Sequence, residues 1–190
     1  MTLEQIKQAI QGEWISIAPE IRPSLAKNAD GSMRPFYLTR AFTYLSGDGF
    51  ELIVINVADP YGKTPLVKIR INGHMKWRGE HPIKEGAQKV DFIADGGYEV
   101  TPLIQVFADA MNQVAGKGFE RWEVNKMQSV MRKAFVPFGL AEGQIFAECD
   151  LIYLHKDMLF WGARNVDGRG FDKEENRPTN LQIPLVRRNW

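Results

Sequence analysis

The chain carries a succession of short runs in which apolar and polar residues alternate, and clusters of turn-forming residues separate them. Alternation with a period of two is the pattern of a β-strand with one face toward the core. The clearest runs are residues 36–45, 50–58, 66–77 and 88–94. Roughly eight or nine such runs, about ten residues apart, are typical of an antiparallel meander that closes into a barrel or a sandwich. A barrel of about eight strands can hold one small ligand.

Two segments depart from this pattern and are predicted to be helical. A capping-box pattern near the N-terminus predicts a short helix over residues 2–11. A Thr-Pro pair at 101–102, followed by apolar residues at helical spacing, predicts a second helix over 101–115 that packs on the barrel. We therefore expect a mainly β chain with two or three helices and a closed antiparallel barrel. Because no linker separates two cores, residues 1–190 are expected to form a single domain.

The composition speaks against several classes of protein. Of the 190 residues, 44% are hydrophobic and 25% are charged, which is ordinary for a soluble globular domain and unlike a disordered chain. The formal net charge is only +1, without a basic stripe, so nucleic acid is not an expected partner. We expect neither a secretory leader nor a membrane span, since no stretch approaches the roughly 20 apolar residues that a spanning helix needs. Cys149 is the single cysteine, so we expect no internal disulfide and a cytoplasmic protein.

One basic residue interrupts the apolar face of the run 36–45. Alternation places on that face Phe36, Leu38, Arg40, Phe42 and Tyr44. Burial of an unpaired guanidinium is costly, so inside a barrel Arg40 must meet a carboxylate, backbone carbonyls, water or an anionic ligand. Three interpretations stay open. Arg40 forms a buried ion pair that fixes the register, or it binds an anion in an apolar pocket, or the opposite face points inward and Arg40 lies on the surface.

Counting inward positions on the later runs extends this set of candidate ligand-binding residues. Trp77 falls on the inward face of the run 66–77, and Cys149, Leu151 and Tyr153 share one face of a later run. The candidate ligand-binding residues are therefore Phe36, Leu38, Arg40, Phe42, Tyr44, Trp77 and Tyr153. Their bulky side chains either fill the core or line a pocket for a hydrophobic ligand.

Acid–base chemistry has few candidates in this chain. If the protein is an enzyme, we expect His74, Glu80 and Tyr153 to act as acid or base at a barrel mouth. Glu148 and Asp150 alternate on one face of a run, either toward solvent or as a carboxylate partner for the arginine of the apolar face.

Metal ligation has even weaker support. The spacing of His74 and His81 fits no tight metal motif, and the acidic loop 165–180 breaks the calcium-loop pattern. Cys149 has no adjacent base and is expected to pack as a small apolar residue. We therefore expect no metal and no cofactor.

Several motifs, in this order along the chain, resemble the conserved domain of the adenomatosis polyposis coli down-regulated (APCDD) family. They are Arg34-Pro35-Phe36-Tyr37-Leu38-Thr39-Arg40-Ala41-Phe42, Gly73, Tyr98-Glu99-Val100-Thr101-Pro102-Leu103, Trp122-Glu123-Val124 and the tail 177–186. The Gly-x-Trp at 12–14 is similar to the start of lipocalins. The resemblance implies a lipocalin-like (calycin-type) barrel with a cavity for a lipid, in a stand-alone member of prokaryotic type. It also implies that Arg40 is a feature of the fold.

The animal members of that family are secreted, membrane-tethered inhibitors of Wnt signalling, rich in disulfides, and this chain with its single cysteine is not expected to share that activity. Our first hypothesis is therefore a binding protein for a small hydrophobic or amphipathic molecule, lipid-like and with an anionic head group. The alternative is a cofactor-independent isomerase, cyclase or lyase that uses the same cavity. A third hypothesis is an interaction module with a filled core, and assembly as a homodimer stays open.

Overall fold

The computed structural model describes residues 1–22, 27, 29–32, 34–165 and 167–188. Within them the strands are β1 (Gly12–Ser16), β2 (Glu20–Arg22), β3 (Phe36–Tyr44), β4 (Gly49–Val57), β5 (Pro65–Glu80), β6 (Gln88–Pro102), β7 (Gln128–Ser129), β8 (Ala147–His155), β9 (Met158–Trp161) and β10 (Leu185–Arg187). The helices are α1 (Leu3–Ile10) and α2 (Gln105–Val114), with short 3₁₀ turns η1 (Ser46–Asp48), η2 (Val136–Phe138) and η3 (Glu174–Asn176). The described chain is therefore mainly β, as the alternation predicts.

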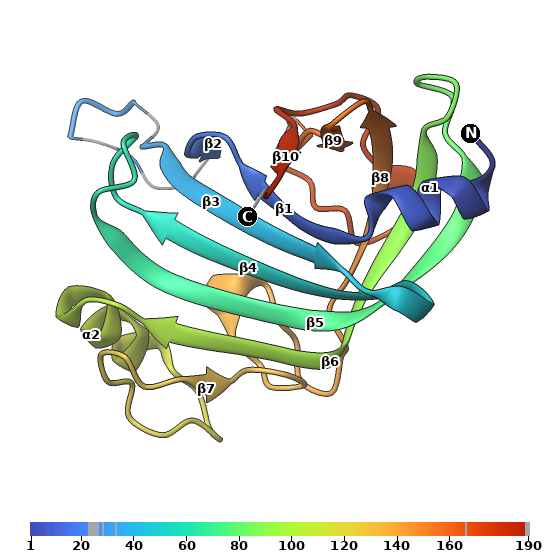
Figure 1. The fold of residues 1–190 in the computed structure, drawn as a ribbon. Helices are drawn as coiled ribbons and strands as arrows, with labels where there is room; N and C mark the ends of the chain where they lie inside the picture. Colours follow the sequence, from blue (N-terminus) through green and yellow to red (C-terminus); the bar gives the residue numbers. More distant parts are fainter. Residues whose placement is uncertain (23–26, 28, 33, 166, 189–190) are drawn as a thin grey trace.

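The strands form one antiparallel sheet that closes on itself (Figure 1). The order of neighbouring strands is β1, β10, β9, β8, β6, β5, β4 and β3. The ring closes because β3 also pairs with β1, with Phe42 opposite Trp14. Among the described residues these eight strands make a closed barrel, which confirms the predicted fold class. The short strands β2 and β7 add to β3 and β6 outside this ring.

Helix α1 crosses one end of the barrel (Figure 1). The predicted capping box is present, and Ile6 and Ile10 are buried against the strands. Directly after the helix, the fully buried Trp14 donates from Nε1 to the carbonyl of Ile10 over 2.7 Å. The guanidinium of Arg187 lies 4.4 Å from the centre of the Trp14 ring and donates to the carbonyls of Ala9 and Gln11. The last turn of α1 is thereby held to the first and last strands of the barrel.

The second helix begins later than the Thr-Pro pair predicts. Thr101 and Pro102 belong to β6, where they pair with Lys68 and Val67 of β5. Because Pro102 is the last residue of its strand, its missing N–H costs the sheet little. In the helix that follows, Ala108 and Met111 are buried and Phe107 packs against the core, whereas Val106 is 76% exposed.

Aromatic rings divide the barrel interior into a filled half and a hollow half. Phe42 contacts the rings of Phe50, Phe92 and Trp161 at centroid distances of 4.5–5.4 Å. On the α1 side of this cluster the interior is packed with apolar side chains such as Met75. On the other side lie the first residues of β3 and the cavity described below. In the described part of the chain, neither α1 nor α2 has the length and apolar character needed to cross a bilayer.

Candidate ligand-binding cavity

The hollow half of the barrel is a cavity of about 390 Å³. Strands β3 to β6 supply a largely apolar wall, which includes Phe36, Leu52, Val54, Ile69, Ile71 and Phe92. The volume lies within the usual range for sites that bind small molecules. A second part of the cavity wall is charged, and its side chains come from β2, β3, β8 and the segment after β9.

Arg40 is buried on the cavity wall, 6% exposed, so the interpretation that places it on the surface is wrong. Its Nε donates to Oε1 of Glu20 over 2.8 Å, and the same oxygen accepts from the hydroxyl of Ser16. The guanidinium carbon lies 4.5 Å from the centre of the Trp161 ring. The predicted buried ion pair is confirmed, although its carboxylate belongs to Glu20 and not to Glu148 or Asp150.

One nitrogen of the Arg40 guanidinium has no hydrogen-bond partner in the described chain. This nitrogen is Nη2, and it is buried. A buried donor without an acceptor costs about 1–3 kcal/mol, and more when it is charged. The ion pair with Glu20 therefore satisfies only part of Arg40, and the interpretation as an anion-binding group stays a prediction.

Two further arginines reach the cavity with carboxylate or amide partners. Nη2 of Arg22 donates to Oε2 of Glu20 over 2.7 Å and to Oε1 of Gln182 over 2.9 Å. Arg164 pairs with Glu148 over 2.9 Å, and this carboxylate is the main cause that raises the pKa of the Arg164 guanidinium. Burial lowers the pKa of Arg22, although Glu20 opposes that shift.

Asp150 is the carboxyl group of the cavity that forms no salt bridge with any described residue. Its side chain is 2% exposed, and Oδ1 accepts from the backbone N–H of Leu151 (2.7 Å) and of Gly162 (2.9 Å). No described residue is hydrogen-bonded to Oδ2. Burial, reinforced by the negative charge of Glu148, raises the pKa of Asp150 to about 7. Such a carboxyl group exchanges its proton near neutral pH.

The close approach between β8 and the end of β9 requires glycine at position 162. A Cβ atom there would lie 2.5 Å from Oδ1 of Asp150 and 1.9 Å from Cγ of Pro178. Gly162 therefore sets the position of the Asp150 carboxyl group and of the segment that carries Arg164.

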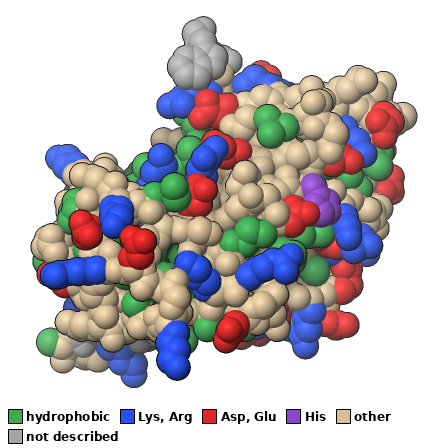
Figure 2. Space-filling view, turned by 90° about the horizontal axis from the view of Figure 1, so that it is seen from below, with side chains coloured by type: hydrophobic (Ala, Val, Ile, Leu, Met, Phe, Trp, Pro, Cys, Tyr) green, Lys and Arg blue, Asp and Glu red, His purple; other side chains and the backbone are tan. Residues whose placement is uncertain are grey.

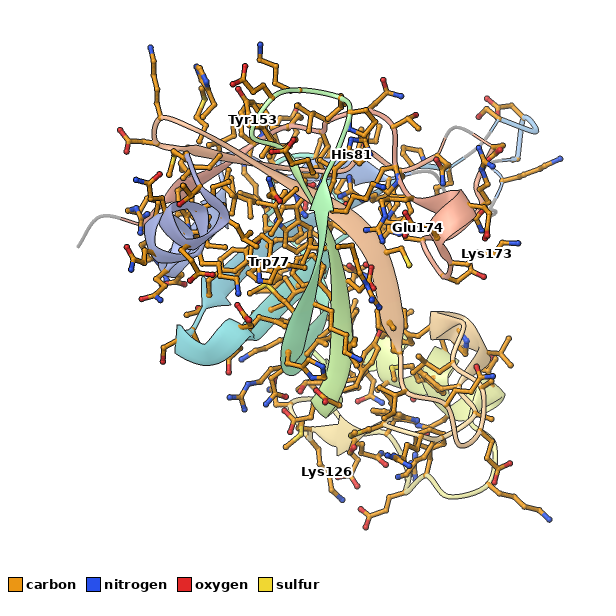
Figure 3. All side chains as sticks on the ribbon, turned by 90° about the vertical axis from the view of Figure 1, so that its right-hand side faces the viewer. Trp77, His81, Lys126, Tyr153, Lys173 and Glu174 are labelled. Carbon is orange, nitrogen blue, oxygen red and sulfur yellow. The ribbon has the colours of Figure 1, made fainter. Side chains whose placement is uncertain are left out.

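Four of the seven candidate ligand-binding residues line the cavity, namely Phe36, Leu38, Arg40 and Phe42. Tyr44 lies deeper, where its buried hydroxyl accepts from Nε1 of Trp161 over 2.8 Å. Trp77 lies toward α1 and donates to Asp48 over 2.9 Å. Tyr153 stacks on His155, away from the cavity lining, and Figure 3 shows Trp77 and Tyr153 in separate parts of the molecule. Ligand binding by the four lining residues stays a prediction.

The inward face predicted for β8 is wrong. The side chains of Glu148 and Asp150 line the cavity, whereas Cys149 is not among the lining residues and lies beside Asp91 and Glu174. The segment after β9 binds the backbone of β8, where the N–H of Cys149 donates to the carbonyl of Phe171 and Arg177 donates to the backbone carbonyl of Asp150. Because both faces of β8 are buried, an apolar residue there does not mark the inward side.

The structure does not bring the three acid–base candidates together. His74 pairs with Asp95 on the barrel wall, with Nδ1 and Oδ2 2.6 Å apart and both side chains more than one-third exposed. Glu80 is exposed at the end of β5, where it pairs in register with Gln88. Tyr153 lies on β8, and none of His74, Glu80 and Tyr153 is among the cavity-lining residues. Catalysis by these residues stays a prediction.

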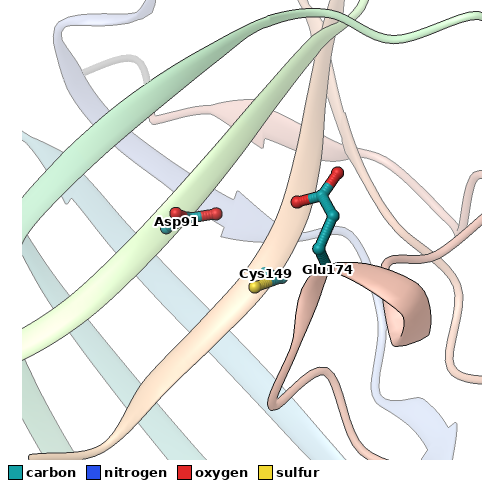
Figure 4. A group of neighbouring side chains, drawn as sticks. All are labelled: Asp91, Cys149 and Glu174. Atoms are coloured by element: carbon teal, nitrogen blue, oxygen red, sulfur yellow. The ribbon is translucent and has the colours of Figure 1, made fainter.

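One group of described residues has atoms of the kinds that ligate metals. Oxygen and sulfur atoms of Asp91, Cys149 and Glu174 lie within 4.8 Å of one another (Figure 4). Asp91 is already bound by Arg78 and Arg177, and Arg177 also binds Glu174. Burial raises the pKa of the Cys149 thiol, which disfavours the thiolate that a metal requires. The arrangement is an ion-pair network that links β5, β6 and η3, and Cys149 of β8 lies beside it.

The outer surface carries charges of both signs. On the face that Figure 2 shows, Lys and Arg side chains are interspersed with Asp and Glu, and hydrophobic side chains appear between them. No protein-family model matches this chain.

Proposed function

We propose that this protein binds one hydrophobic or amphipathic small molecule inside the barrel. The observation that carries the proposal is the cavity of about 390 Å³, which is lined by apolar side chains on β3 to β6 and by a group of charged side chains. A site that only needed to stabilise the fold would be filled, because close packing is the rule in protein interiors.

The apolar and the charged lining residues indicate how the bound molecule would be oriented. Its apolar body would contact side chains such as Phe36, Val54 and Ile69. Its polar end would face Arg40, whose buried Nη2 has no partner in the described chain. A carboxylate or another acidic group would give this nitrogen an acceptor, which favours a lipid-like molecule with an anionic end.

We also propose that the chain is a stand-alone member of the APCDD family and works in the cytoplasm. The ordered motifs of the sequence support the first point, and the single cysteine supports the second. A lipid-like ligand agrees with the lipid cavity that the resemblance implies.

A cavity-filling variant tests the binding proposal. Val54 lines the cavity, whereas the next residue, Ile55, is not among the lining residues and pairs on the sheet with Thr39 and Lys68. The probe is N-phenyl-1-naphthylamine, a neutral dye that becomes fluorescent in apolar sites. We expect Val54→Trp to weaken its binding at least tenfold and Ile55→Trp to leave it unchanged.

The same two variants also test whether a natural ligand occupies the cavity. Mass spectrometry of an organic extract should find a small molecule in the wild-type protein and in Ile55→Trp, at a lower level in Val54→Trp. Circular dichroism checks that both variants fold. Equal dye binding by Val54→Trp and the wild type would contradict binding in the cavity.

A further inference from the structure

We propose that the cavity takes up an acidic ligand together with one proton, and that Asp150 holds this proton. The ligand would be an organic acid with an apolar body, bound as an anion against a neutral Asp150. This inference rests on the proposed function, because it concerns the polar end of the same cavity.

The charges around the polar end are balanced before any ligand binds. Three guanidinium groups and three carboxyl groups meet there, namely Arg22, Arg40, Arg164, Glu20, Glu148 and Asp150. If all six are ionised, a bound anion adds one negative charge that nothing compensates in a buried site, which is costly. One proton removes that excess charge.

Hydrogen bonding indicates which carboxyl group takes the proton. Glu20 uses one oxygen for Arg40 and the other for Arg22, at 2.8 and 2.7 Å. Glu148 is paired with Arg164. Within the described chain Asp150 has only backbone N–H partners, both on Oδ1, so Oδ2 can carry a proton without breaking an ion pair. Burial has already raised the pKa of this group to about 7.

The charged and titratable groups that surround Asp150 in the described chain come from β3, β8 and the segment after β9. From its own strand it faces Glu148, and from the segment after β9 it faces Arg164. From β3, Tyr44 and Arg40 lie nearby, and burial raises the pKa of the Tyr44 phenol far above its ordinary value. Arg177 touches only the backbone carbonyl of Asp150.

The sign of the pH effect follows from this arrangement. An anion beside Asp150 raises the pKa of the carboxyl group further, so the complex binds a proton more tightly than the empty cavity does. Affinity for the anion should therefore be highest below pH 7, where Asp150 is already neutral, and should fall about tenfold per pH unit above it. A neutral ligand should bind equally well across this range.

Two dyes with one aromatic scaffold test the inference. 1-Anilinonaphthalene-8-sulfonate carries a fixed negative charge, and N-phenyl-1-naphthylamine is its uncharged counterpart. Between about pH 6.5 and 8.5 we expect the Kd of the sulfonate for the wild-type protein to rise at least tenfold. The Kd of the neutral dye should not change, which also shows that the cavity stays intact over this range.

Two variants test whether the pH dependence of sulfonate binding comes from Asp150 or from the loss of any carboxylate. Asp150→Asn keeps the oxygen that accepts from Leu151 and Gly162, and it should bind the sulfonate with a pH-independent Kd, at least tenfold tighter than the wild type at the alkaline end. Asp157→Asn, at an exposed position in the turn of the same hairpin, should behave like the wild type. Neutral-dye binding shows whether each variant is folded.

Proton uptake gives an independent measurement on the wild-type protein. Calorimetry of sulfonate binding at about pH 7.5, in two buffers of different ionisation enthalpy, should show uptake of about 0.8 proton per dye. A pH-independent Kd for the sulfonate in the wild type, an unchanged pH dependence in Asp150→Asn or the absence of proton uptake would each overturn the inference. Failure of both dyes to bind would instead contradict the proposed function.

Discussion

The guanidinium of Arg40 and the carboxylate of Glu20 form an ion pair inside the barrel, with Nε and Oε1 2.8 Å apart and both side chains at most 5% exposed. Glu20 lies on β2, outside the closed ring of eight strands, and it bonds to Arg22 with its second oxygen. A three-residue strand thus supplies the counter-ion for two arginines of the cavity.

We expect Glu20→Gln to lower the free energy of unfolding by about 3–5 kcal/mol, because it leaves Arg40 and Arg22 without their buried counter-ion. Urea denaturation measures this change. The matched control is Glu51→Gln, which removes one of the two carboxylate partners of the half-exposed Arg70 and should cost less than about 1 kcal/mol. Similar, small losses in both variants would show that the buried pair is not needed for stability.

The raised pKa of Asp150 predicts a pH-dependent stability. The pKa lies near 3.8 in the unfolded chain and about 7 in the folded protein, so the folded state binds the proton more tightly. The free energy of unfolding should therefore fall as the pH rises from about 4 to about 7, and the loss should be complete above that window.

Asp150→Asn removes this dependence. At pH 8 we expect the variant to exceed the wild type by about 2–4 kcal/mol in the free energy of unfolding, and at pH 4 to match it. Denaturation curves at several pH values measure both. A difference of the same size at every pH would mean that Asp150 is not protonated in the folded state.

We expect Gly162→Ala to destabilise the protein by about 1–3 kcal/mol or more, because the new methyl group would overlap Pro178 and the Asp150 carboxyl group. It should also weaken dye binding, since the segment with Arg164 must move. Gly170→Ala is the matched control, because its methyl group would meet its nearest described neighbour at 3.9 Å. Thermal unfolding and dye titration compare the two, and equal behaviour would exclude a close-packed contact at Gly162.

Arg187→Leu should loosen α1. The variant loses the hydrogen bonds to the carbonyls of Ala9 and Gln11 and the contact with the Trp14 ring, at a cost of about 1–3 kcal/mol. Hydrogen exchange at the amides of α1 should accelerate more than exchange in β4 and β5. Arg169→Leu, which breaks an exposed pair with Asp167, is the control. Unchanged exchange in α1 would show that Arg187 does not anchor the helix.

Sequence patterns predict those parts of the fold in which one face of an element is buried and the other is not. In β3 the apolar alternation correctly places Leu38, Arg40 and Phe42 inside, because the opposite face carries polar residues such as Thr39. The capping box of α1 is equally local, and it is present.

The remaining parts depend on contacts between segments that are distant in sequence. Both faces of β8 are buried, so its alternation gives no indication that Asp150 faces the cavity. β2 is too short for a period to be recognised, and Glu20 could not be identified as the partner of Arg40. Gly162 and Arg164 belong to no sequence motif that would mark them as cavity residues, because their roles arise from contacts with Asp150 and Glu148 of β8.

The pairing of β1 with β10 has a consequence for synthesis of the protein. Trp14 pairs with Arg187, so closure of the ring joins two segments that are far apart in the sequence. A nascent chain that stops short of residue 185 leaves β1 and β9 each with an unpaired edge, and such edges promote aggregation. Folding on the ribosome therefore cannot close the barrel before β10 has emerged, and a truncation before residue 185 should yield an insoluble product.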